Sequence, residues 1–474
     1  MNQYTNQNRG VFKICLILFA CFAYSSCKKF VQVPLPPNEI VSAAVFSDSA
    51  DATSAVLGIY TACMNSYQLT IGNGGLSLFT GFSSDELVPT SISNSGNYQF
   101  YTNSILSNNV YNEDYLWFLA YQMIYQTNAC IEGIENNQSL SNTLRGQLLG
   151  ESKMVRAFFY FNLVNLYGEV PLVTSTNYSV NSVMGRSNID TVYAQITNDL
   201  LSAESLLPIN SSLGVLRPGY LSTEALLAKV YLFEGQWSNA INTASKVISS
   251  GDFSLQNNLS GVFLEGSSEA IWQLSPVVAG RATVEGGVYV PSMSTVIPGY
   301  IINRNLLNAF EQGDLRRSEW LDSNVVSGKA YYYPYKYRLV SNSGQSPQEA
   351  YTILRLSEQY LIRAEAEVQA NDVNDALTDL NTIRIRAGLL PYAGATDQSS
   401  LLNAIYHERQ VELFCECGNR WFDLKRTNMI DEVMGGSTGV CASKGGSWVS
   451  TAALYPIPLS QLLANSSLVQ NSGY

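Results

Sequence analysis

The chain has 474 residues, of which 46% are hydrophobic and 14% are charged. This composition is typical of a folded protein and excludes a chain that is disordered throughout. The length fits either several domains or one large helical repeat assembly. The formal net charge of −11 disfavours nucleic-acid binding, because proteins that bind phosphate backbones generally present a basic face. The single histidine, His407, excludes metal sites that need several imidazoles.

The N-terminus has the pattern of a signal peptide that ends at a lipidated cysteine. Arg9 and Lys13 precede an apolar run over residues 14–24. This run is shorter than the roughly 20 residues of a membrane-spanning helix but has the length of a signal-peptide core. Two serines follow at 25 and 26, and then Cys27. We predict a lipoprotein signal peptide over residues 1–26 and acylation of Cys27, with an ordinary signal peptide as the alternative.

Residues 27–44 are predicted to form an extended tether between the lipid and the folded body. Pro34, Pro36 and Pro37 disfavour a helix there. Residues 1–26 hold two basic residues and no acid, so their removal changes the formal net charge from −11 to −13.

The remaining cysteines predict neither a disulfide framework nor a metal site. Apart from Cys27 and the two cysteines within residues 1–26, the chain has five cysteines, and an odd number cannot all be paired in disulfides within the chain. Cys415 and Cys417 form a C-x-C pair, which is too little to hold a metal without other soft ligands. We therefore predict no cofactor, and buried thiols at Cys63, Cys130, Cys415, Cys417 and Cys441.

Hydrophobic periodicity predicts a mainly helical body. Ser47 or Asp48 can cap a first helix with one apolar face, formed by Ala52, Ala55, Val56, Ile59, Tyr60 and Cys63. Further helices are predicted over residues 114–135, 143–167 and 191–206, with Gly168 and Pro208 as stops.

Two helix pairs, near residues 222–250 and 355–388, share a pattern of small and apolar residues. The spacing 12, 4, 3 links Ala228, Ala240, Ala244 and Val247, and it recurs in Ala364, Ala376, Leu380 and Ile383. Small residues at these offsets let antiparallel helices approach closely, as in tetratricopeptide repeats. The sequence therefore predicts a tetratricopeptide-like scaffold with long irregular inserts and a few short strands.

Two segments lack helical periodicity and are the predicted sites of recognition. Residues 252–350 are rich in Gly, Ser, Pro and Tyr and contain a β-like run at Tyr331–Tyr337. Residues Tyr67–Tyr111 form the second irregular stretch. Irregular segments on a rigid frame commonly carry binding residues.

Motifs along the whole chain resemble the SusD/RagB family. The C-terminal third carries the strings RLSEQYLIRAEA (355–366), NTIRIRAG (381–388), ERQVEL (408–413), GNRWFDLKR (418–426), YPIP (455–458) and QNSGY (470–474). The start carries SCKKF (26–30), VFSD (45–48) and LGIY (57–60). The resemblance implies a single SusD-like domain over residues 45–474.

The resemblance also implies a function. Members of this family are lipid-anchored in the outer membrane and face the cell exterior. They hold oligosaccharides or peptides over a TonB-dependent transporter of the SusC type and act as its lid. The expected partners are thus this transporter and a glycan or peptide, and no catalysis is expected.

Charged residues in the C-terminal motifs alternate in sign at helical spacing. This pattern predicts structural ion pairs rather than an active site, at Glu408, Arg409, Glu412, Arg420, Asp423 and Arg426. We likewise predict a structural hydrogen bond for His407.

A glycan groove combines aromatic rings, which stack on the C–H faces of sugars, with polar side chains that pair with hydroxyls. By position in the family, the predicted ligand residues are Asp85, Asn97, Tyr98, Phe100, Tyr101, Tyr289 and Tyr300. The tyrosines of Tyr331–Tyr337 could also stack on sugars, but a strand whose side chains pack in the core explains them equally well.

Three other functions stay open at this point. A peptide receptor would keep the fold and change the ligand. A glycoside hydrolase would need two carboxylates about 5 to 9 Å apart across a cleft, and no motif pairs them. A pure scaffold would bind no small ligand.

Overall fold

A computed structural model of the chain describes residues 45–46, 48–65, 69–91, 95–135, 137–209, 213–278, 280–341 and 348–474. The signal peptide, Cys27 and the tether over residues 27–44 lie outside these residues. The chain divides into two units, Met1–Val45 and Phe46–Tyr474, and the fold given below is that of the second.

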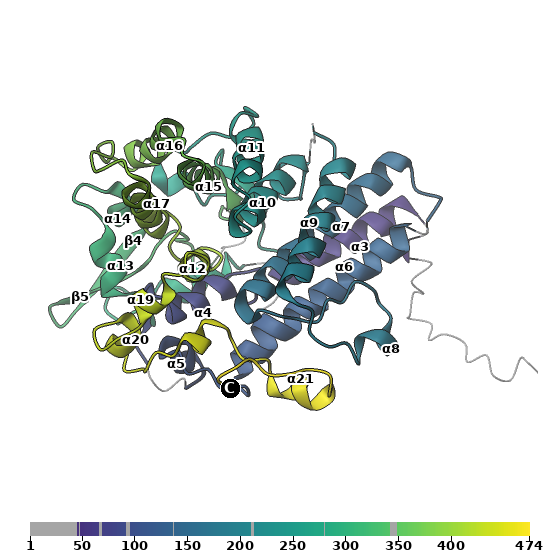
Figure 1. Cartoon of the computed structure of the whole chain (residues 1–474), viewed down its shortest axis with the longest axis horizontal. Helices are drawn as coiled ribbons and strands as arrows, with labels where there is room; N and C mark the ends of the chain where they lie inside the picture. Colours follow the sequence, from purple (N-terminus) through teal and green to yellow (C-terminus); the bar gives the residue numbers. More distant parts are fainter. Residues whose placement is uncertain are drawn as a thin grey trace, which may run out of the picture. The chain divides into compact units, whose positions relative to one another are not determined.

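Four long helices form the N-terminal part of this unit: α3 (Ser49–Met64), α6 (Leu119–Glu135), α7 (Asn142–Tyr167) and α9 (Ile189–Leu206). The carboxylate of Asp48 caps α3 by accepting hydrogen bonds from the backbone N–H groups of Ala50 and Asp51, at 2.8 and 2.9 Å. Helix α7 packs against both α6 and α9 (Figure 1). The predicted helices are confirmed, with a π-helical segment, η2 (Tyr111–Phe118), leading into α6.

The helix pairs predicted from small residues are confirmed as α10 (Tyr220–Phe233) with α11 (Trp237–Ile248), and α15 (Leu356–Gln369) with α16 (Val373–Arg386). One buried cluster joins Ala228, Ala240 and Ala244 to α15 through Ile362 and Ala366. A second joins α15 and α16 to α17 (Gln398–Glu412). The two pairs are therefore consecutive in space, although more than a hundred residues separate them in sequence (Figure 1).

The segment between these pairs is less irregular than predicted. Strand β2 (Ala270–Leu274) pairs antiparallel with β6 (Tyr351–Arg355), and β4 (Leu321–Val326) pairs with β5 (Lys329–Pro334). Ser327 and Gly328, at φ 52° and 77°, form the tight hairpin turn between β4 and β5. Part of the tyrosine run is thus a strand, and in it Tyr333 is buried.

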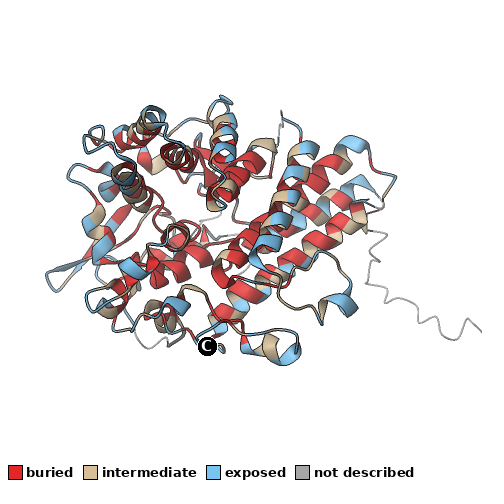
Figure 2. Cartoon of the chain, in the orientation of Figure 1, coloured by how far each residue is buried: buried red, intermediate tan, exposed pale blue. Residues whose placement is uncertain are grey.

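The stretch Tyr67–Tyr111, predicted as irregular, also contains regular structure. Helix α4 (Gly75–Ser83) is buried along its whole length (Figure 2), β1 (Leu87–Pro89) follows it, and α5 (Ser95–Tyr101) comes next. A helix that is covered on every side has no polar face, so its sequence shows no 3.6-residue period. This is why the sequence pattern missed α4.

Short elements complete the described fold. They are α8 (Tyr178–Asn181), η3 (Leu259–Gly261), α12 (Val284–Tyr289), β3 (Tyr300–Ile302), α13 (Arg304–Ala309), α14 (Leu315–Glu319), α18 (Asn419–Arg426), α19 (Ile430–Met434), α20 (Val440–Ser443), η4 (Ser450–Ala453) and α21 (Leu459–Ala464). None of the helices in the described residues is both long and apolar enough to cross a membrane.

A buried network of ion pairs holds the repeats to the rest of the fold. The carboxylate of Glu412 on α17 pairs with Arg316 at 2.9 Å, with Arg355 at 2.6 Å, and with Arg386. Burial would raise the pKa of this carboxyl, but the three guanidinium groups hold its pKa well below the usual range.

The structural ion pairs predicted for the C-terminal motifs are confirmed, at Glu408, Arg409, Glu412, Arg420, Asp423 and Arg426. His407 is bonded as predicted, with its Nε2 at 2.8 Å from the carbonyl oxygen of Ala309.

The close contact of α10 with α11 gives a stability prediction. Ala240 has no exposed surface, so Ala240→Leu should force the two helices apart and lower the free energy of unfolding by about 1 to 3 kcal/mol. Asn242→Leu, on the exposed side of the same helix, should change it by less than about 0.5 kcal/mol. Urea denaturation of both variants measures this, and equal stability of the two would contradict the packing described.

Candidate ligand-binding site

The pairing of β1 with β3 brings the two predicted recognition segments together. Leu87 lies opposite Ile302, and Pro89 lies opposite Tyr300. The side-chain amide of Asn97 donates a hydrogen bond to Tyr300 Oη at 3.1 Å. The rings of Tyr289 and Tyr300 lie edge to face, with their centroids 6.4 Å apart. Residues that are some 200 positions apart in sequence thus form one cluster.

The short helix α5 presents two tyrosines on one side. Tyr98 and Tyr101 are three residues apart and therefore share a face. Both are half-buried, and their ring centroids are 5.8 Å apart. The ammonium group of Lys444 lies 5.3 Å from the Tyr101 centroid, a cation–π distance. Together with Tyr300, which is also half-buried, these rings make up what we name the tyrosine face: Tyr98, Tyr101 and Tyr300.

The prediction for Phe100 needs correction. Its ring has 0% exposure and packs on Phe79 and Tyr455, with centroid separations of 4.8 and 5.3 Å. In this conformation it has no surface to offer a ligand. Tyr289 is also buried, and it supports Tyr300 from behind. Both rings belong to the core beneath the tyrosine face.

Asp85 is likewise buried, and its carboxylate is already paired. It accepts two hydrogen bonds from Arg420, both 2.8 Å long, and one from Gln410 at 3.1 Å. Burial would raise the pKa of Asp85, but the guanidinium of Arg420 outweighs this effect, and the pKa is lowered. The prediction that Asp85 contacts the ligand therefore needs correction. Its carboxylate instead connects the residues just before β1 to Arg420 of α18. Asn97 is also buried and supports Tyr300.

Lys444 is a residue of this site that the sequence analysis missed. Its buried ammonium group donates hydrogen bonds to the carbonyl oxygens of Phe82 at 2.6 Å, Ser83 at 3.2 Å and Ser84. These carbonyls lie at the C-terminal end of α4, where a cation is favoured. Burial lowers the pKa of Lys444 to about 7. No sequence pattern pointed to it, because its partners are backbone atoms.

Two buried acids lie beneath the same region. Glu86 accepts a hydrogen bond from the backbone N–H of Cys415 at 3.0 Å, and Glu285 lies on α12. Burial raises the pKa of each carboxyl to about 8. Neither side chain is exposed, so neither is available to a ligand.

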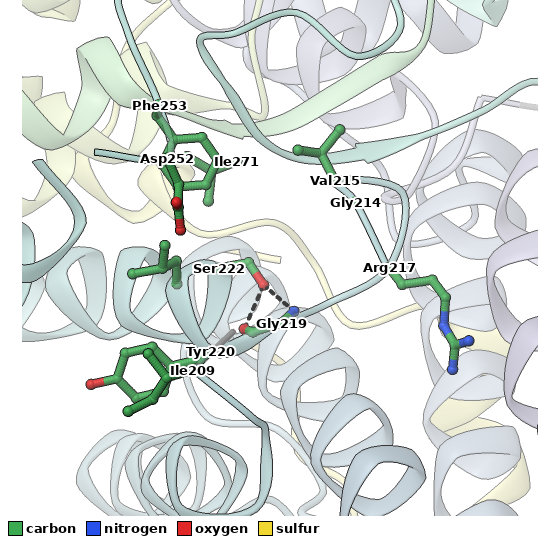
Figure 3. A pocket seen from close by; sticks show the side chains of 11 residues that line it. Ile209, Gly214, Val215, Arg217, Gly219, Tyr220, Ser222, Asp252, Phe253 and Ile271 are labelled. Carbon is green, nitrogen blue, oxygen red and sulfur yellow. Dashed lines mark hydrogen bonds between the residues drawn. The ribbon is translucent and has the colours of Figure 1, made fainter. Parts of the chain in front are cut away.

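One cavity lies away from these residues. It has a volume of about 520 Å³ and is bordered by α10 and the segments before it and after α11 (Figure 3). Two of its polar side chains have partners within the protein, because the Ser222 hydroxyl is hydrogen-bonded to the backbone of Gly219 and Arg217 pairs with Glu151 at 2.6 Å. In Figure 3 the Arg217 side chain points away from the other labelled residues. None of the predicted ligand residues lines this cavity.

The described residues contain no group of three or more His, Cys, Asp or Glu side chains that could hold a metal ion. Within the same residues, Cys63, Cys130, Cys415, Cys417 and Cys441 are free cysteines, and all five are buried, as predicted.

The raised pKa values of Glu86 and Glu285 predict a pH dependence of stability. The folded state keeps a proton on each carboxyl that the unfolded chain releases above its ordinary pKa of 4.5. The resulting stabilisation is complete in acid and is lost as the pH rises toward about 8, by roughly 1 kcal/mol per pH unit for each group. Glu86→Gln and Glu285→Gln should remove this loss. Urea unfolding from about pH 6 to 8, with the exposed Glu432→Gln as control, measures it; parallel profiles of all variants and wild type would be contrary evidence.

Comparison with known proteins matches two parts of the chain to family models. Residues 300–474 match the model described as SusD family, and residues 61–232 match the one described as starch-binding associating with outer membrane. A SusD-like protein of Formosa agariphila is 26% identical over 97% of this chain and 98% of its own length.

Solved structures of SusD proteins have the same fold. A SusD superfamily protein of Bacteroides vulgatus matches with a TM-score of 0.80 at 20% identity, over 90% of this chain and 99% of that one. A laminarin binding SusD-like protein matches with a TM-score of 0.70 at 23% identity, over 90% and 99%. The tetratricopeptide-like scaffold is thus the fold of SusD structures, and the two family models together match well over half of the sequence. The chain belongs to the SusD-like family.

Proposed function

We propose that this protein captures a glycan at the cell surface and delivers it to a TonB-dependent transporter of the SusC type, for which it acts as a lid. The observation that carries the glycan assignment is the tyrosine face, on which Tyr98, Tyr101 and Tyr300 keep exposed area above a rigid, buried base. Aromatic rings of this kind stack on the C–H faces of sugars. A SusD-like protein of the same fold binds laminarin, and one family model is described as starch-binding.

The base of the face supports binding by preorganisation. Asn97 holds the Tyr300 hydroxyl, and Lys444 lies close to the ring of Tyr101. Side chains that are fixed before the ligand arrives lose little entropy when it binds, so they favour affinity. Tyr98 and Tyr101 also carry hydroxyl groups, which can exchange hydrogen bonds with sugar hydroxyls.

The protein acts as a receptor and not as an enzyme in this proposal. Cleavage of a glycosidic bond needs two opposed carboxylates that reach the ligand. Around the tyrosine face, Asp85 is paired with Arg420, and Glu86 and Glu285 are buried. His407 is bonded to a backbone carbonyl. These contacts support binding without turnover.

The N-terminal pattern and the family support the proposed location. In this proposal the mature chain starts at Cys27, carries lipid there, and is held in the outer membrane facing the cell exterior. The description of the family model over residues 61–232 supports the association with the outer membrane.

The glycan proposal predicts how single alanine variants bind. Tyr98→Ala and Tyr101→Ala should each weaken binding of the cognate oligosaccharide by roughly five- to tenfold, because each removes a stacking ring, and should leave the fold intact. Phe100→Ala should instead lower the free energy of unfolding by about 3 to 5 kcal/mol, because it empties a core position. Calorimetric titration with neutral oligosaccharides and with peptides, next to thermal melting, tests this.

Tyr125→Ala is the matched control, because Tyr125 is an exposed tyrosine on another helix. Saccharide recovered unchanged after binding supports a receptor. Binding of peptides alone would replace the glycan by a peptide, and unaltered affinity in both face variants would remove the tyrosine face from the site.

The lipid anchor gives a separate prediction. Cys27→Ala should release the protein from membranes in soluble form, because acyl chains contribute about 0.8 kcal/mol per buried CH₂. Mass spectrometry of the mature N-terminus provides the direct measurement. A mature chain that begins at another residue, without lipid, would rule out the anchor.

A further inference from the structure

A second cleft, formed by residues other than those of the tyrosine face, has the composition of a ligand site. It has a volume of about 300 Å³, at the lower end of the range of small-molecule sites. Its walls come from the junction of η2 and α6, from α8 and the segment before it, and from α21 and the residues after it. Figure 1 labels α8 and α21, the short helices that contribute to it. No residue of the tyrosine face lines this cleft.

The aromatic residues of the cleft form a rigid floor and two exposed walls. Trp117 is buried at the floor, with its ring 5.0 Å from Tyr121 and 4.9 Å from Tyr167 between centroids. The Tyr121 hydroxyl donates a hydrogen bond to the carbonyl of Pro171 at 2.9 Å, which fixes that ring. Phe118 and Tyr178, by contrast, are 55% and 80% exposed. Exposed rings above a fixed floor leave flat apolar faces available for stacking.

The backbone at this position is unusual. Trp117 and Phe118 end the π-helical segment η2, just before α6 begins. Turns of π-helix are rare and occur frequently at functional sites. The segment places the buried ring of Trp117 and the exposed ring of Phe118 next to each other in sequence, and both line the cleft.

The polar groups of the cleft are neutral amides and hydroxyls. Asn181, Gln461 and Asn465 line it, and no charged residue does. The Gln461 amide has one weak contact, at 3.4 Å from Ser460 Oγ. Among the described residues, nothing donates a hydrogen bond to the Oδ1 of Asn181, and a buried acceptor without a donor is costly. The cleft therefore suits a neutral ligand that has flat apolar faces and hydroxyl groups.

We propose that this cleft is a second carbohydrate-binding site, specific for uncharged sugar rings that stack on Phe118 and Tyr178 above Trp117. The choice of a sugar among neutral ligands rests on the proposed function. The location rests on the cleft itself. Two separated sites on one receptor hold a long glycan at two points, which raises its effective affinity without further contacts at either site.

The test starts from a Tyr98→Ala/Tyr101→Ala/Tyr300→Ala variant, in which all three rings of the tyrosine face are removed. The probes are laminarihexaose, maltohexaose, cellohexaose, xylohexaose and mannohexaose, with an oligogalacturonate as the charged counterpart. At least one neutral probe should still bind and change the tryptophan emission of the protein. Because Trp117 is the one tryptophan that lines the cleft, Trp117→Phe should abolish this change.

Phe118→Ala and Tyr178→Ala, added to the same variant, should each weaken the remaining binding by about five- to tenfold. Tyr125→Ala is again the control, because its ring is 54% exposed on α6 and does not line the cleft. Thermal melting confirms that each variant is folded.

Several outcomes would overturn the second site. One is the absence of neutral saccharide binding once the tyrosine face is removed, with intact binding in the wild type. Another is equal affinity of the Phe118, Tyr178 and Tyr125 variants. Loss of a protein partner in the Phe118 variant, with saccharide binding unchanged, would assign the cleft to a protein instead. Binding that depends on the cleft alone would refute the tyrosine face and leave the second site standing.

Discussion

The carboxylate of Glu412 is the point on which the described fold depends. It has no exposed area and pairs with Arg316 on α14, Arg355 at the end of β6 and Arg386 on α16. Each partner comes from a different element, so one side chain joins the helical repeats to the segment inserted between them. Removal of one member of a buried ion pair leaves an uncompensated charge, which lowers the free energy of unfolding by about 3 to 5 kcal/mol. The network therefore constrains these elements to one arrangement.

The tyrosine face is connected to this network by the turn between α17 and α18. Cys415 and Cys417 adopt left-handed φ angles of 52° and 46° in this turn, which few residues other than glycine tolerate. Lys336 binds the carbonyls of Glu412 and Phe414, at 2.9 and 2.8 Å. The backbone N–H of Cys415 in turn binds Glu86, next to Asp85. This turn therefore links the ion-pair network to Glu86, the residue that precedes β1.

Further contacts connect β1 and α4 to the rings of the tyrosine face. Arg420, at the start of α18, holds Asp85, and β1 pairs with β3, which carries Tyr300. Lys444 binds the end of α4 beneath Tyr101. The charged side chains of the family motifs are paired within the protein. They form a layer that supports the tyrosine face, as the proposed preorganised site requires.

The sequence predicted what depends on local periodicity and composition. The repeat helices followed from the small residues around Ala240 and Ala376, and the ion pairs followed from alternating charges. The sequence could not show that Phe100 is buried whereas Tyr98 is partly exposed. Helix α5 has only seven residues and carries rings on both sides, so it shows no periodicity that distinguishes the buried face from the exposed face. The sequence also could not predict the β1–β3 pairing or the contacts of Lys444, since both depend on backbone partners that are distant in sequence.

In the proposed function, a glycan binds on the tyrosine face of an otherwise rigid receptor. The most direct measurement is a crystal structure of the mature protein with a neutral oligosaccharide that binds in solution. We expect a sugar ring stacked on Tyr98 or Tyr101, hydrogen-bonded near Tyr300, with the glycosidic bonds intact and Asp85 still paired to Arg420. A saccharide that contacts none of these three tyrosines, or one that is cleaved, would contradict it.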